Sequence, residues 1–289
     1  MLGQFVVNGL ITGMLYSLLA IGFALVYNTT RIFHIAAAGV YVFAAYMFYL
    51  FAVQLAMPLF AAALVAAALT MALSLLMETS VYRPLKQRRG SHNAAMIASI
   101  GLMTVVVNVV ALFFGNETRV VENSTQHSLD IHGIILTMPQ VWQLCAGGIL
   151  IVVLLLSLRF TSWGLRMRAL SADEVLFETL GYNTRGMRNL VFLMSGAVIA
   201  AASCLTVYDI GMAPTMGMNV LISAIVAMVI GGTGRFGACV VGGLTLGVLQ
   251  SLTVYWVSSN WQNAVTFVVL LIFLFLRPQG IAGYKQRTV

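Results

Sequence analysis

Charged residues are scarce in this sequence: only 8% of its 289 residues are Asp, Glu, Lys or Arg, whereas 61% are hydrophobic. About a quarter of the residues of a soluble domain are charged, so the composition excludes a soluble protein and indicates an integral membrane protein. The apolar residues form runs of helical length instead of alternating segments of about ten residues, which excludes an outer-membrane barrel. We therefore expect an all-α fold, a polytopic transmembrane helical bundle.

Cysteine is also scarce. The three cysteines, Cys145, Cys204 and Cys239, lie in or beside apolar runs and show no paired spacing. This pattern excludes a disulfide framework and predicts small packing residues.

Residues that could carry catalysis are few and scattered. Glu78 and Asp209 lie at the expected ends of apolar runs, where water can solvate them. No Ser–His–Asp arrangement, HExxH motif or pair of carboxylates is present, so we expect no catalytic residue. The remaining polar residues of the apolar runs stand singly on different runs: His34, Asn108, Asn219 and Gln250.

Metal, nucleotide and nucleic-acid sites are not expected either. His127 and His132 share the loop 116–140 with single carboxylates, but their spacing matches no recognised ligand pattern. Residues 232–237 (GTGRFG) match the dinucleotide fingerprint GxGxxG without the βαβ unit that the fingerprint requires. We expect no cofactor in this chain, so any ATP is used by partner subunits. The net charge of +7 is spread along the chain and does not indicate a nucleic-acid partner.

Nine apolar runs are long enough to be candidate membrane spans, and together they predict a single transmembrane domain over residues 1–289, with about eight to nine spans in contact with membrane lipid. The run 34–52 is rich in Ala and Gly, and it either spans the membrane or is re-entrant. The nine runs lie at about 4–28, 34–52, 56–77, 94–115, 141–158, 189–208, 217–233, 237–256 and 261–276.

The basic residues predict the orientation of these spans. If the loop 78–93 is cytoplasmic, alternation places fourteen of the 15 Lys and Arg on the cytoplasmic side and only Arg119 outside. Short cytoplasmic loops carry such an excess of Lys and Arg. The N-terminus is then outside, and the C-terminus and the stretch 159–188 are cytoplasmic.

The stretch 159–188 is the longest polar interruption of the chain. Ser171 to Glu174 has the form of a capping box, and Gly181 stands where a left-handed residue would end a helix. A helix over 172–180 has about nine residues, fewer than the ~12–15 that an isolated helix needs in water. It carries acidic groups and no Lys or Arg, which favours a protein partner over a lipid surface. A solvated connecting helix is the alternative.

Two glycine-containing features are of interest outside that stretch. Gly9-xxx-Gly13 and Gly243-xxx-Gly247 allow close helix packing, either within one subunit, which we favour, or between subunits. Around Pro214, glycines interrupt the helical pattern, as in a broken helix that lines a solute path or in an ordinary outside loop. The candidate residues for such a path are Met212, Pro214, Met216 and Asn219, together with His34.

Four blocks of this sequence resemble the permease subunits of the bacterial branched-chain amino-acid ABC importers, a family that includes urea and short-amide permeases. The first block is YRPLK at 82–86 followed by IASIGL at 97–102, and the second is RALSAD at 168–173 with Leu180 and Gly181. The third consists of the glycines of 231–243, and the last is RPQG at 277–280. The blocks cover about 200 residues in the family's order.

The resemblance implies an ABC importer permease fold in the bacterial inner membrane. It implies four partners: a second related permease, two cytoplasmic ATPase subunits and an external solute-binding protein. In such importers a short cytoplasmic coupling helix docks on the ATPase. The residues that fall in or beside this coupling loop are Arg168, Ser171, Asp173, Glu174, Leu180 and Gly181.

The solute is a branched-chain or other hydrophobic amino acid if this chain follows most of the family, and urea or a short amide is the alternative. One departure bears on this choice, because the acidic residue of the family motif at the start of the second run is Gly39 here and its histidine is alanine. A self-contained secondary transporter or channel is an alternative of another class. Its ion coupling would need charged residues within spans that here are nearly free of charge.

Overall fold

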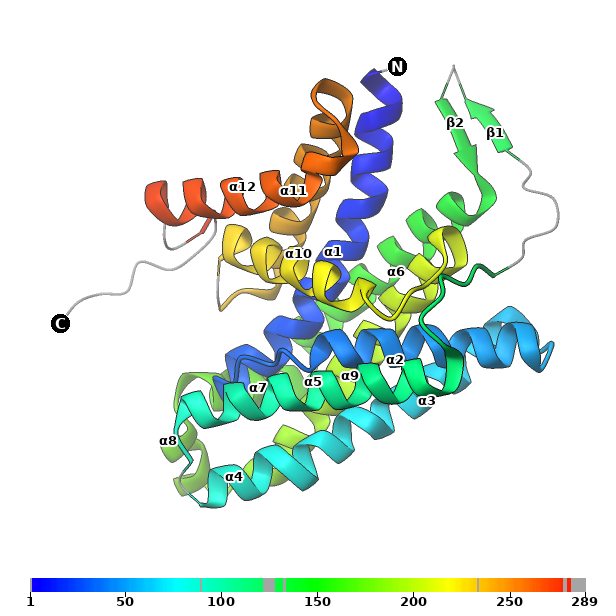
Figure 1. Ribbon diagram of the computed structural model, residues 1–289. Coiled ribbons are helices and arrows are strands. Elements are labelled where there is room, and N and C mark those ends of the chain that lie inside the picture. Colours follow the sequence, from blue (N-terminus) through cyan, green and yellow to red (C-terminus); the bar gives the residue numbers. More distant parts are fainter. Residues whose placement is uncertain are drawn as a thin grey trace. The chain divides into compact units, whose positions relative to one another are not determined.

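The computed structural model of the chain describes residues 2–88, 90–121, 128–131, 134–232, 234–277 and 280–281 (Figure 1). They form two compact units. One consists of residues 1–24, 122–152 and 219–289, and the other of residues 25–121 and 153–218. The prediction of a single transmembrane domain stays a prediction.

In the first unit, the N-terminal part of α1 (Leu2–Thr30) packs against α11 (Phe236–Trp256) through the two glycine motifs. A Cβ atom on Gly247 would lie 2.4 Å from the Cα atom of Gly13, and one on Gly9 would lie 2.8 Å from the Cα atom of Val248. No side chain fits at such distances. The motifs therefore serve packing within one subunit, as favoured from the sequence.

The other elements of this unit are α10, α12 and a small hairpin. An antiparallel pair of strands, β1 (Ser128–Ile131) and β2 (Ile134–Thr137), lies in the predicted loop 116–140, with Ser128 opposite Thr137. The helices are the first part of α6 (Met138–Phe160), α10 (Met216–Gly231), the 3₁₀ turn η3 (Ser259–Trp261) and α12 (Gln262–Leu276).

The second unit is built around α2 (Ala37–Tyr49), which contacts α3 (Leu59–Met77), α5 (His92–Phe114) and α9 (Thr184–Ile210). Nearly every residue of α2 is buried, because its small Ala and Gly residues let neighbouring helices approach closely. With the π-helical turn η1 (Leu50–Gln54), α2 forms a helix of 18 residues, long enough to span a membrane. This 18-residue helix, Ala37–Gln54, corresponds to the predicted run 34–52.

The remaining helices of this unit are short. The helix α3 continues through the π-helical turn η2 (Glu78–Tyr82) into α4 (Arg83–Gln87). The predicted cytoplasmic stretch forms α7 (Ser162–Ala172) and α8 (Glu174–Thr179), where the sequence predicted a single helix.

The all-α polytopic bundle is confirmed. Among the described residues, seven helices have the length and hydropathy of a membrane span, and two shorter apolar helices, α10 and α12, match the seventh and ninth predicted runs. His127 and His132 lie outside the described residues. Within the described ranges, no group of three His, Cys, Asp or Glu residues could hold a metal ion.

Candidate coupling site and solute path

Asp173 starts the short helix α8. Its backbone is extended, with φ −154° and ψ 111°, and its carboxylate accepts hydrogen bonds from the N–H groups of Val175 (2.9 Å) and Leu176 (3.0 Å). The predicted capping box is therefore wrong, because Ser171 belongs to the last turn of α7 and has no free helix end to cap. Asp173 is the residue between the two helices and takes the cap.

The end of α8 is as predicted. Gly181 has a φ of +81°, in the left-handed region, and its N–H donates to the carbonyl of Glu178 (2.9 Å). The helix has six residues, fewer than the nine expected, so it depends on packing for its stability. Phe177 supplies that packing: it is 3% exposed and stacks on the ring of Tyr182 at a centroid distance of 5.0 Å.

Three apolar side chains of α8 and its C-cap are uncovered. Val175, Leu176 and Leu180 are 72%, 55% and 65% exposed. These three residues form what we call the α8 face. Exposed Leu and Val side chains grouped on a polar segment are available for contact with another surface, because burial would remove them from water.

Three polar contacts connect the α7–α8 segment to the ends of other helices in the unit. The Ser171 hydroxyl donates to the carbonyl of Asn28 near the end of α1 (2.7 Å), and an ion pair joins Glu174 to Lys86 of α4. Arg31, just after α1, donates to the carbonyl of Ser171 (3.5 Å). The α7–α8 segment is thus in contact with the C-terminal end of α1 and with α4. Arg168 is exposed and donates to the carbonyl of Arg159 (3.4 Å), within the same segment.

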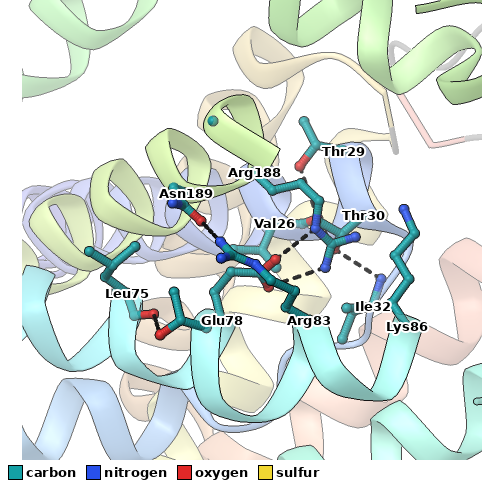
Figure 2. A network of polar contacts seen from close by, with 12 residues as sticks. Val26, Thr29, Thr30, Ile32, Leu75, Glu78, Arg83, Lys86, Arg188 and Asn189 are labelled. Carbon is teal, nitrogen blue, oxygen red and sulfur yellow. Dashed lines mark hydrogen bonds and ion pairs between the residues drawn. The ribbon is translucent and has the colours of Figure 1, made fainter. Parts of the chain in front are cut away.

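A buried ion pair lies at the junction of η2 and α9 (Figure 2). The guanidinium of Arg188 donates to both carboxylate oxygens of Glu78, at 2.7 and 3.1 Å, and the two side chains are 6% and 1% exposed. Beside them Arg83 donates to the amide oxygen of Asn189. The sequence placed Glu78 at a solvated span end, and this was wrong, because the partner that permits its burial is 110 residues away.

His34 lies between α1 and α2 and is fully buried. Its Nδ1 atom is 2.8 Å from the hydroxyl of Tyr82, which donates to the hydroxyl of Ser99 (2.9 Å), and Ser99 also accepts from the N–H of Ala36 (2.8 Å). Among the described residues its Nε2 atom has no hydrogen-bond partner.

The helix break around Pro214 is present. The helix α9 ends at Ile210, α10 begins at Met216, and a two-residue bridge pairs Met212 with Arg119 through hydrogen bonds of 2.9 and 2.7 Å. A Cβ atom on Gly217 would lie 2.6 Å from the carbonyl oxygen of Ala38. The break therefore packs against the start of α2, the helix that follows His34.

The candidate path residues differ in exposure. Met212 is 1% exposed and packs in a cluster with Tyr46 and Val207, and Pro214 is also buried. Met216 is half-buried and Asn219 is exposed. Their role in a path stays a prediction.

The arrangement defines a class of protein: a polytopic helical membrane protein in which a short helix with an uncovered apolar face is attached to the ends of long apolar helices. The sequence also matches, over residues 5–274, the family described as the permease component of the branched-chain amino acid transport system. The chain therefore belongs to that family.

Curated relatives match nearly the full length. The high-affinity branched-chain amino acid transport system permease protein BraD of Pseudomonas aeruginosa is 28% identical, over 98% of this chain and 96% of its own. The LivH permease protein of the same kind of system in Escherichia coli K12 is also 28% identical, over 96% and 94%. A solved structure, PsaBC from Streptococcus pneumoniae in complex with Fab, has a similar fold, with a TM-score of 0.56, 13% identity and coverage of 96% of this chain and 93% of that one.

Proposed function

We propose that this chain is the permease subunit of an ATP-driven importer of branched-chain or other hydrophobic amino acids in the bacterial inner membrane. The observation that carries the proposal is the match to BraD and LivH over almost the whole length, in a chain whose α8 face is uncovered. A second related permease, two cytoplasmic ATPase subunits and an external solute-binding protein complete the importer. ATP is bound by the ATPases, and this chain needs no cofactor.

The α8 face docks in the ATPase in this proposal. Docking removes the side chains of Val175, Leu176 and Leu180 from water, and the burial of each Val or Leu contributes roughly 1.5–3 kcal/mol. When ATP moves the ATPases, α8 moves with them. The contacts of Ser171 with Asn28 and of Glu174 with Lys86 then transmit the motion to the ends of α1 and α4.

The distribution of Lys and Arg supports an orientation in which the α7–α8 segment and the C-terminus are cytoplasmic and the N-terminus is outside. The solute then crosses from the outside past the break at Pro214. The proposed path residues are Met212, Pro214, Met216, Asn219 and His34. They offer no carboxylate for the ammonium group of an amino acid, which is consistent with transient passage after release from a binding protein.

The test is co-purification from the native membrane in mild detergent. The wild-type chain should bring an ATPase and a second permease with it, and Val175→Asp combined with Leu176→Asp should lose the ATPase but keep the second permease. Leu165→Asp is the matched control, because Leu165 of α7 is 63% exposed and lies outside the α8 face. A chain that purifies alone and moves solute in liposomes without ATP would instead be a secondary transporter.

The solute is tested separately. Uptake of radiolabelled leucine and of urea is compared in cells that carry the complete transport system and in cells in which only this chain is deleted. Loss of leucine uptake on deletion supports the amino-acid assignment. Loss of urea uptake without loss of leucine uptake would replace the amino-acid assignment by the urea assignment.

A further inference from the structure

A pocket of about 220 Å³ lies beside the buried ion pair, within the second unit. Its walls come from α4, α8 and the first turn of α9. One of its lining residues, Lys86, also forms the ion pair with Glu174 described above. The pocket is lined on the α4 side by Arg83 and Lys86, and on the α9 side by Thr184 and Arg185.

The lining carries an excess of positive charge. Glu78 and Arg188 also line the pocket but neutralise each other through their two hydrogen bonds. Lys86 is paired with Glu174 of α8, so two cations, Arg83 and Arg185, remain against one carboxylate, that of Glu178. Arg83 keeps its full charge, because its partner, the amide of Asn189, is neutral. Figure 2 shows the guanidinium groups of Arg83 and Arg188 beside Glu78, with the Lys86 side chain farther away.

Thr184 points to a ligand independently of the charge. It is only 7% exposed, lines the pocket, and its hydroxyl has no hydrogen-bond partner among the residues that the structure describes. A buried hydroxyl without a partner is unfavourable because it has lost its hydrogen bonds to water, so a partner from outside the chain would offset this penalty. Thr184 is also the first residue of the 27-residue helix α9, whose positive dipole end favours an anion.

We infer that this pocket binds the phosphate group of an anionic phospholipid. Arginine side chains, a hydroxyl donor and a helix N-terminus together are the groups that hold phosphate in proteins. A lipid is favoured over free phosphate by position. The α4 wall is the last part of an apolar helix of spanning length, Leu59–Gln87. The pocket therefore opens at the level of the lipid headgroups. The bound headgroup would contact residues of α4 and α9 and lie next to α8.

The experiment measures binding to the purified full-length chain in a neutral detergent. The probes are dihexanoyl-phosphatidylglycerol, dihexanoyl-phosphatidylcholine and inorganic phosphate, each titrated by isothermal calorimetry. The variants are Arg185→Gln and Thr184→Val, with Thr184→Ser retaining the hydroxyl. The matched control is Arg88→Gln, because Arg88 is an exposed cation at the end of α4 that does not line the pocket. Size-exclusion elution and circular dichroism verify that each variant is folded.

The inference expects phosphatidylglycerol to bind more tightly than the other two probes. Arg185→Gln should weaken that binding about fivefold, the effect of about 1 kcal/mol for one basic residue at an anionic headgroup. Thr184→Val should weaken it, whereas Thr184→Ser and Arg88→Gln should not. Inorganic phosphate binding as tightly as phosphatidylglycerol would overturn the lipid assignment. Equal binding by all folded variants would overturn the site itself.

Discussion

The buried ion pair of Glu78 and Arg188 allows a quantitative test of the packing of the second unit. The Arg188→Met variant removes the guanidinium and leaves the carboxylate of Glu78, which is 1% exposed, without a counter-ion. Removing one partner of a buried pair destabilises a protein by about 3–5 kcal/mol, because the remaining charge is uncompensated. The Glu78→Leu, Arg188→Met double variant should recover most of this loss, since it replaces both charges by apolar side chains of similar volume.

The same chain supplies the matched control. Lys86 and Glu174 form an ion pair whose side chains are 45% and 38% exposed, so water and salt screen it. Lys86→Met, the same kind of substitution, should therefore cost only ~0–1 kcal/mol. The difference of at least about 2 kcal/mol between the two single variants corresponds to roughly a thirtyfold change in the folding equilibrium.

The assay is reversible unfolding of the full-length chain in mixed micelles, titrated with sodium dodecyl sulfate and followed by circular dichroism. The free energy of unfolding is compared between the wild type, the two single variants and the double variant. A loss below about 1 kcal/mol for Arg188→Met would refute the reasoning, because it would mean that water reaches Glu78. A double variant as unstable as Arg188→Met would show that the carboxylate contributes through other contacts.

Two further outcomes follow from single positions. Gly247→Leu should reduce the yield of folded chain, because its Cβ atom would lie 2.4 Å from Gly13, whereas Gly101→Leu, with no atom within 4 Å, should not; fluorescence-detected size exclusion measures both. Asp173→Ala should lower the hydrogen-exchange protection of α8 by about 1 kcal/mol, as the loss of a helix cap does, and unchanged protection would contradict the cap.

Features of the fold that depend only on residues close together in the sequence could be predicted from it. The apolar runs gave the spans, and Gly181 ended α8 where expected, since a left-handed cap depends on a single residue. The capping box failed for a physical reason. Ser171 and Asp173 both suit a helix start, and α7, which the polar composition of the stretch concealed, extends through Ser171 and leaves Asp173 as the cap.

Long-range features could not be predicted in this way. Nothing in the sequence near Glu78 indicates that Arg188 will cover it, because pairing over 110 residues depends on how α3 and α9 pack. The ring stacking of Phe177 on Tyr182 was likewise missed, because Phe177 stands beside Val175 and Leu176 and the sequence does not indicate which of the three is buried. The resemblance to the family indicated the coupling segment but did not predict these contacts.

The glycine contact between α1 and α11 has a consequence for biosynthesis. Gly13 lies about 230 residues before the residues of α11 that it touches. At the usual rate of roughly 5–20 residues per second, a ribosome needs on the order of 10–50 s to make the intervening chain. During that interval the surface of α1 around Gly9 and Gly13 lacks its partner. The segment made first thus completes its packing near the end of synthesis, and a chain that stops before α11 leaves this surface of α1 uncovered.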